Sequence, residues 1–269
     1  MATRIPHLLE PYLALPPECA QILLTSVLGA STNWLVLRYL YSYLRRPTED
    51  APADDTRVVL VSFMRDFAFW KKGPAKWGLL SPPPPPPRPL RFFKGLCHIT
   101  AEGEAASPVT KGRRTLRGAK IPDVQRELEA AVADVSGGGG KVVLVVDQPD
   151  LLLAATEEDV GGLVVKNMLL DLQEKVHASI VTVAADEPLI GAQATTLEKE
   201  HASFVLGLAH AAEMVVGLRL LDTGTARDVS GVLRVTAGGD GDGERTFEEA
   251  ELLYFVGGDG SVKVFGRGQ

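Results

Sequence analysis

Residues 23–40, LLTSVLGASTNWLVLRYL, have the layout of a phosphate-binding loop, because an apolar run leads through a turn of small residues into an amphipathic segment. A P-loop reads G-x-x-x-x-G-K-[ST], in which the lysine neutralises the β- and γ-phosphates and the hydroxyl binds Mg²⁺. In the register that keeps strand and helix in place, the four diagnostic positions are occupied by Ser26, Ser31, Thr32 and Asn33. Gly29 alone keeps the glycine character of the motif.

The missing lysine and hydroxyl have a predictable energetic effect. Losing one charge-assisted contact to a phosphate costs roughly 1.5–3 kcal/mol, and losing the metal ligand adds to this, so nucleotide binding weakens about a hundredfold or more. Backbone N–H groups could still line an anion-binding nest. We therefore expect no independent ATP hydrolysis. Taken alone, the loop is more simply an ordinary strand-to-helix turn.

An acidic strand end adds a second element of the same pattern. The stretch KVVLVVDQPD, residues 141–150, is an apolar run that ends in Asp147. P-loop folds keep at this place the Walker B carboxylate, which holds Mg²⁺. An aspartate at a strand end is also common for turn formation alone. The order of elements around it is nevertheless typical of a RecA-like fold whose nucleotide site has lost its chemistry.

The elements that position these residues follow from hydrophobic patterning. Short apolar runs predict strands at 22–25, 58–63, 92–99, 142–146, 180–184, 214–221, 232–235, 252–256 and 262–265. The early runs are continuous, as in parallel strands that are buried on both faces. Helices are predicted at 34–45, 122–135, 164–176 and 197–212. We therefore expect an α/β protein with a mainly parallel central sheet, helices on both faces and a C-terminal antiparallel hairpin extension.

The chain of 269 residues is long enough for one large α/β domain, and we expect a single RecA-like domain over residues 1–269. Low-complexity stretches predict flexible insertions at 81–89, 101–120 and 136–140. The first is proline-rich and the second is polar and basic. The third is a glycine run that precedes a strand, so it is a tether and no phosphate cradle.

Composition argues against several functions. The net charge of −6 and the isoelectric point near 5.5 argue against nucleic-acid binding through a broad basic face. Cys19 and Cys97 match no metal-ligand spacing and the histidines show no i, i+4 pairing, so we expect no metal and no other cofactor. No apolar segment is uninterrupted enough for a membrane span and no signal peptide is evident, so we expect a cytoplasmic protein, with a nuclear location also compatible.

The stretch VVLVSFMRDFAFWKKGPAKWGLL, residues 58–80, resembles the signature of the sixth subunit of the Elongator complex. In that family a strand ending in Ser-Phe is followed by Asp, aromatic residues, a basic pair and Gly-Leu. The matching positions here are Ser62, Phe63, Asp66, Phe69, Trp70, Lys71, Lys72, Gly78 and Leu79. A looser similarity in the order of elements runs from about Leu8 to Phe265, and it does not cover the insertions.

The resemblance implies a RecA-like pseudo-ATPase, not an enzyme, because the family has no ATP-binding motif in this subunit. It implies a hetero-hexameric ring with two copies each of this chain and of two paralogous subunits, the fourth and fifth, beside the remaining Elongator subunits. The ring would bind tRNA for modification of the wobble uridine. Any ATP hydrolysis by the ring would come from the partner subunits.

The residues that could contact tRNA are basic. The 101–120 stretch supplies the best electrostatic candidates for a phosphate backbone, namely Lys111, Arg113, Arg114 and Arg117. RecA-like rings also present two loops to the central pore. Here these would be about 156–162, which is acidic, and about 186–201, which offers Lys199. Each segment is equally compatible with a solvated loop that has no partner.

Two other functions stay open on the sequence. The chain could be an ATPase with an unorthodox phosphate loop, which nucleotide binding by the isolated chain would support. It could also be a RecA- or KaiC-like regulatory scaffold without RNA. Copurification of RNA or of two RecA-like paralogues would distinguish the Elongator subunit from such a scaffold.

Overall fold

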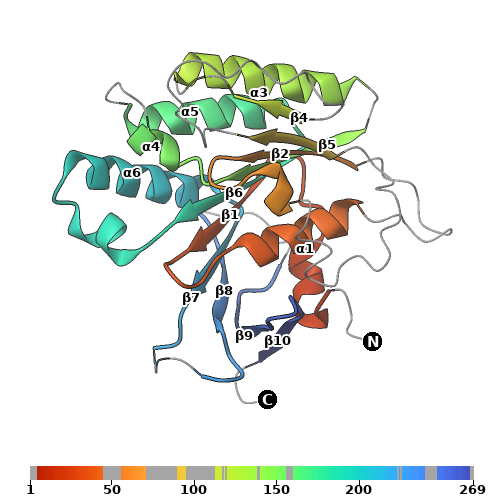
Figure 1. Cartoon of the computed structure of the whole chain (residues 1–269), viewed down its shortest axis with the longest axis vertical. Helices are drawn as coiled ribbons and strands as arrows, with labels where there is room; N and C mark the ends of the chain where they lie inside the picture. The colour runs from red at the N-terminus through yellow and green to blue at the C-terminus, as the bar shows by residue number, and fades with distance from the viewer. Residues whose placement is uncertain are drawn as a thin grey trace.

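The computed structural model describes residues 5–44, 56–70, 90–94, 113–116, 118, 120–137, 140–155, 160–222, 224, 226–239 and 247–266. They form one ten-stranded sheet with helices against both faces (Figure 1). In spatial order, its parallel strands are β7 (Met214–Arg219), β1 (Ala20–Ser26), β6 (Ala178–Ala184), β5 (Lys141–Asp147), β2 (Thr56–Ser62), β3 (Leu90–Lys94) and β4 (Arg113–Thr115). The predicted parallel centre of the sheet is confirmed.

Three antiparallel strands extend the sheet beyond β7. They are β8 (Gly231–Ala237), β9 (Ala250–Val256) and β10 (Val262–Gly266). The last turn closes where the N–H of Gly257 donates to the carbonyl of Ser261 at 2.8 Å. Gly260 has φ of +83° in this turn, a conformation that glycine adopts without strain. The predicted C-terminal antiparallel extension is therefore also confirmed.

Helices cover both faces of the sheet because the buried strands present apolar side chains alternately to either side. One face packs against α3 (Ile121–Ser136), α5 (Gly162–Gln173) and α6 (Thr196–Ala211), and Leu23 of β1 belongs to this core. The opposite face packs against α1 (Asn33–Leu44) and the 3₁₀ helix η1 (His7–Leu13), and Ile22 and Leu24 of β1 belong to that second core. Two short helical segments, α4 (Leu151–Ala155) and η2 (Pro188–Ala192), follow β5 and β6.

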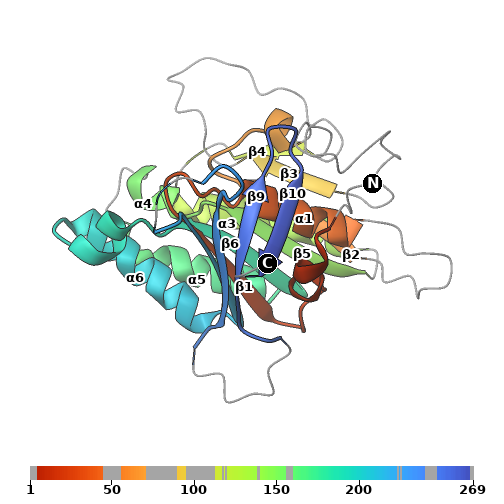
Figure 2. The same cartoon turned by 90° about the horizontal axis from the view of Figure 1, so that it is seen from below.

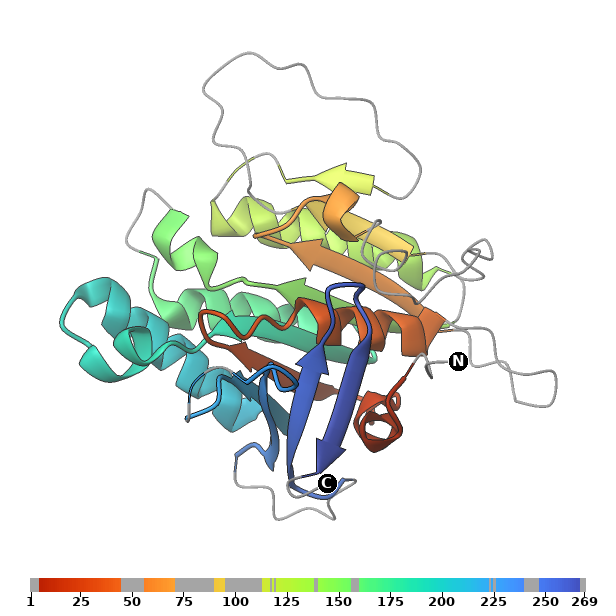
Figure 3. The same cartoon turned by 60° about the horizontal axis from the view of Figure 1, so that its bottom comes forward.

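The hairpin of β9 and β10 lies over α1, as Figures 2 and 3 show. The rings of Trp34 on α1 and Tyr254 on β9 have their centroids 5.2 Å apart. Most side chains of α1 are buried as a result, since the helix lies between the sheet and the hairpin. The helix that follows the degenerate loop is therefore held on two sides by apolar contacts.

Two predicted loops are partly wrong. Residues Arg113–Thr115 form β4, which supplies partners for the backbone groups that β3 would otherwise leave open at the sheet edge. The segment 186–201 contains η2 and the start of α6, whose N-terminus is closed by a capping box between Thr195 and Glu198. The predicted stretches 81–89, 101–112 and 156–159 lie outside the described residues.

Candidate functional site at the carboxyl edge of the sheet

The loop between β1 and α1 is a tight turn. Val27 and Ala30 form an antiparallel bridge, and the N–H of Ala30 donates to the carbonyl of Val27 at 2.8 Å. Gly29 has φ of +91°, which explains the one glycine that the loop retains. Thr32 is buried, and its carbonyl accepts the N–H groups of Leu35 and Val36, which begins α1. Backbone hydrogen bonds within the loop and with the start of α1 therefore stabilise this turn.

A carboxylate of the same chain binds the backbone of this turn. The N–H of Leu28 donates to Oδ1 of Asp186 at 2.7 Å, and Asp186 is the second residue after β6. The adjoining residue Ala185 donates its N–H to the carbonyl of Ser26, also at 2.7 Å. Backbone N–H groups in such a loop are the groups that would bind phosphate. Asp186 places a negative charge there instead, and a carboxylate repels a phosphate.

Asp147 ends β5 as expected, and both of its carboxylate oxygens have partners inside the protein. The hydroxyl of Ser62 on β2 donates to Oδ2 at 2.6 Å, and the hydroxyl of Thr182 on β6 donates to Oδ1 at 2.9 Å. The side chain is 1% exposed, and burial raises the pKa of Asp147 although both hydroxyls act in the opposite direction. This geometry joins the ends of three neighbouring strands, which is a structural use of a carboxylate.

Asp150, three residues after Asp147, is a second buried acid at this edge. Oδ2 of Asp150 accepts the N–H of Ala184 at 3.3 Å, and Nε2 of His201 donates to the carbonyl of the same residue at 2.9 Å. Asp150 is 6% exposed, and its other oxygen has no hydrogen-bond partner. Burial raises its pKa to about 6, although the hydrogen bond from the backbone of Ala184 and the neighbouring His201 act in the opposite direction. Asp150 and His201 thus both form hydrogen bonds with the backbone of Ala184, the last residue of β6, two positions before Asp186.

Neither residue of this pair was identified from the sequence. Asp150 stands three positions after the strand-terminal Asp147, so its place at the carboxyl edge could have been inferred. His201 lies on α6, and no local pattern relates it to Asp150, from which it is 51 positions distant in the chain. Only the packing of α6 against the sheet brings the two together.

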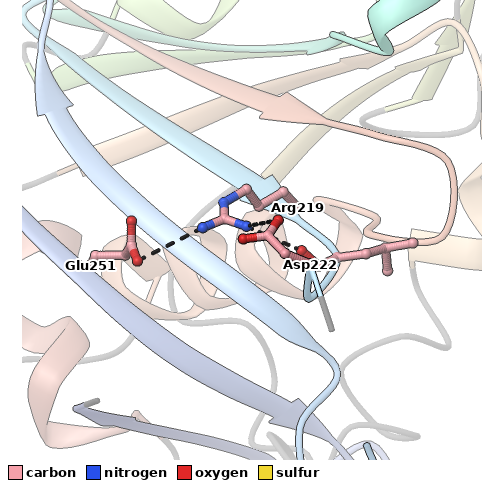
Figure 4. Close-up of polar contacts among 4 residues, drawn as sticks. Arg219, Asp222 and Glu251 are labelled. Atoms are coloured by element: carbon pink, nitrogen blue, oxygen red, sulfur yellow. Dashed lines mark hydrogen bonds and ion pairs between the residues drawn. The ribbon is translucent and has the colours of Figure 1, made fainter. Parts of the chain in front are cut away.

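Arg219 is a cation at this edge, at the end of β7 beside β1. Its Nη1 lies 2.7 Å from Oδ1 of Asp222, and its Nη2 lies 3.8 Å from Oε1 of Glu251 on β9, as Figure 4 shows. Nη1 also donates to the carbonyl of Leu220 at 3.4 Å. Because two carboxylates flank the guanidinium, its charge is already compensated within the chain. The sequence did not single out this arginine.

Three of the predicted RNA-contact residues, Arg113, Arg114 and Lys199, lie within the described part of the chain. Arg113 and Arg114 lie on β4, the outermost parallel strand, with four other strands between it and β1. Lys199 is exposed on α6. Lys111 and Arg117 lie outside the described residues. The structure therefore separates Lys199 from the described part of the basic stretch.

In the described part of the chain, no group of three or more His, Cys, Asp or Glu side chains could hold a metal ion. No helix within the described ranges is long and apolar enough to cross a membrane.

The fold and this edge define a RecA-like α/β protein with a degenerate phosphate loop. A crystal structure of a KaiC-like protein from the hyperthermophilic archaeon Pyrococcus horikoshii has the same fold, with a TM-score of 0.56, 98% of each chain covered and 14% identity. Among curated proteins, the chain is similar to Elongator complex protein 6 of Xenopus laevis, with 24% identity over 247 residues, which cover 88% of this chain and 86% of the relative. This match confirms the resemblance to the Elongator subunit-six family. No protein-family model matches the sequence.

Proposed function

We propose that this chain is a non-catalytic, RecA-like subunit of the Elongator complex. In this proposal it assembles with two paralogous RecA-like subunits into a hetero-hexameric ring that supports tRNA binding for wobble-uridine modification. The similarity to Elongator complex protein 6 supports membership of this complex, and the RecA-like fold supports assembly into a ring. The subunit acts in the cytoplasm or the nucleus and contributes structure and RNA contacts.

The observation that carries the non-catalytic role is the internal pairing of the groups that would perform nucleotide chemistry. Leu28 N–H is bound to Asp186, and both oxygens of Asp147 accept hydroxyl groups of neighbouring strands. The P-loop lysine is replaced by Thr32, a buried residue at the start of α1. An ATPase keeps its carboxylate available to the Mg²⁺ shell and its loop amides available to phosphate. Here the carboxylate of Asp147 and the loop amide of Leu28 have internal partners.

The experiment is purification of the natively expressed, tagged chain, followed by mass spectrometry of the bound proteins and sequencing of the bound RNA. We expect the fourth and fifth Elongator subunits in amounts equal to the tagged chain, together with tRNA. Recovery of RecA-like partners without RNA would favour a KaiC-like regulatory scaffold. Recovery of no Elongator subunit would contradict the proposal.

Calorimetry on the purified chain tests the pseudo-ATPase role separately. We expect no binding of Mg²⁺-ATP in the low-micromolar range, since the loss of the lysine and the hydroxyl weakens binding about a hundredfold or more. Low-micromolar affinity for ATP would instead support an unorthodox ATPase.

A further inference from the structure

Arg38 on α1 is a buried cation without a counter-charge in the described part of the chain. It is 3% exposed, although arginine is almost never fully buried unless it is paired. Its Nε and Nη1 have no hydrogen-bond partner there, and no ion pair of the described residues includes it. Burial lowers the pKa of Arg38 to about 10, and the group that opposes this shift is the phenol of Tyr41. The guanidinium charge is therefore uncompensated among the described residues.

Trp34 adds a second donor without a partner to the same face of α1. It stands four positions before Arg38, so the two side chains are neighbours on the helix surface. Its Nε1 is buried and has no acceptor among the described residues, while its ring stacks on Tyr254 of β9. This is the face that the hairpin of β9 and β10 covers in Figures 2 and 3. Arginine and tryptophan side chains only donate hydrogen bonds, so the missing partner is an acceptor.

An anion completes this site, whereas a water molecule does not. Water can accept from the N–H groups, but it leaves the buried charge of Arg38 uncompensated, which is strongly destabilising. A carboxylate or a phosphate group supplies both the acceptor oxygens and the charge, and it matches the planar guanidinium. Apolar side chains from the sheet, η1 and the hairpin pack around α1, so the occupant must be compact.

The site is separate from the degenerate phosphate loop. Arg38 stands six positions after Thr32, the residue in place of the P-loop lysine, which corresponds to about 9 Å of helix rise. In that loop the amide of Leu28 already binds Asp186. An anion at Arg38 would consequently not occupy the place that a P-loop gives to a nucleotide.

We propose that Arg38 and Trp34 bind a compact oxyanion, a carboxylate or a phosphate group, beneath the hairpin of β9 and β10. The oxyanion neutralises the guanidinium and accepts hydrogen bonds from Arg38 and from the indole of Trp34. Its binding stabilises the folded chain, because it compensates a charge that folding buries. The inference goes beyond the Elongator role and does not depend on it.

Equilibrium dialysis of the full chain against radiolabelled inorganic phosphate and, separately, acetate tests the site directly. We expect one saturable site in wild type, none in Arg38→Met, and weaker binding in Arg38→Lys, which keeps the charge but lacks the planar fork. The matched control is Arg234→Met, which changes an exposed arginine on β8 and should bind like wild type. A site for one of the two anions alone would identify the oxyanion. Binding of neither anion, or equal binding by Arg38→Met, would overturn the inference.

Urea unfolding provides the second measurement. The bound anion, at ten times its dissociation constant, should lower the unfolding constant of wild type about tenfold relative to chloride at equal ionic strength. Arg38→Met should show only the general effect of the salt, and in chloride it should be at least as stable as wild type, because an uncompensated charge is removed. Equal anion effects in wild type and Arg38→Met, or a marked loss of stability of Arg38→Met in chloride, would overturn the inference.

Discussion

The backbone N–H of Leu28 donates to the carboxylate of Asp186 across 2.7 Å, although the two residues are 158 positions apart in the chain. The contact ties the turn after β1 to the segment after β6 and supplies an anion from within the protein. The carboxylate of Asp186 therefore occupies a backbone N–H of the loop without any bound ligand. In the degenerate phosphate loop, the amide of Leu28 is consequently occupied by a carboxylate of the same chain.

Replacing Asp186 by alanine should loosen this turn. Loss of the charge-assisted hydrogen bond removes roughly 1.5 kcal/mol of local stability at a partly solvated site, which corresponds to about tenfold faster opening. Hydrogen–deuterium exchange over residues 27–30 measures this directly. Glu187→Ala is the control, since Glu187 is the exposed neighbouring acid. Unchanged exchange in Asp186→Ala would show that the turn is held by its own backbone alone.

Asp147 should prove necessary for stability. Asp147→Ala leaves the hydroxyls of Ser62 and Thr182 without the carboxylate that they share, at a site that is fully buried. Unsatisfied buried hydroxyls cost about 1–3 kcal/mol each, so we expect the free energy of unfolding to fall by about 2–4 kcal/mol in urea denaturation. A double-mutant cycle with Ser62→Ala should show coupling between the two residues. A neutral or stabilising Asp147→Ala would indicate a carboxylate kept for a metal or a partner.

The buried Asp150 predicts a pH dependence of stability. Burial raises its pKa from 3.8 to about 6, so the folded protein binds this proton more tightly than the unfolded chain. Its stabilising contribution is therefore complete below about pH 4 and is lost as the pH rises through about 6, by about 3 kcal/mol in total. His201 and Asp147 are the titratable neighbours that modulate this proton.

The Asp150→Asn variant should flatten that slope. Unfolding free energies of wild type and Asp150→Asn are compared in urea between pH 4 and pH 7, and the variant should gain relative stability towards neutral pH. Asp228→Asn, which changes an exposed carboxylate, serves as the control. Parallel pH profiles for wild type and Asp150→Asn would refute the assignment.

The basic stretch should influence tRNA binding by the assembled ring. Replacing Lys111, Arg113, Arg114 and Arg117 with alanine should weaken binding and reduce its salt slope by at most about four counterions. Arg126→Ala with Lys175→Ala is the control, because these cations are already paired with Asp123 and Glu129. Superimposable salt curves for wild type and the quadruple variant would direct attention to Lys199.

Hydrophobic patterning predicted most of the described fold. The predicted apolar runs correspond to β1, β2, β5 and β6. Continuous runs of Val, Ile and Leu are typical of strands that are buried on both faces. The same reasoning missed β4, a strand of three polar residues whose order depends on pairing with β3. It also treated 186–201 as a loop, although Thr195 and Glu198 form a capping box that the sequence displays.

The sequence by itself determined what this loop lacks, since the absence of a lysine at Thr32 and of a hydroxyl at Asn33 is a matter of residue type. It also placed Asp147 at a strand end, because the preceding run is apolar.

Only the tertiary structure decided how these residues are used. The partners Asp186, Thr182, His201 and Glu251 come from distant segments, and their contacts exist because the sheet order puts β6 between β1 and β5 and β9 near β7. Hydrogen bonds act over about 3 Å, so they depend on a chain already folded, whereas hydrophobic periodicity is a property of neighbouring residues.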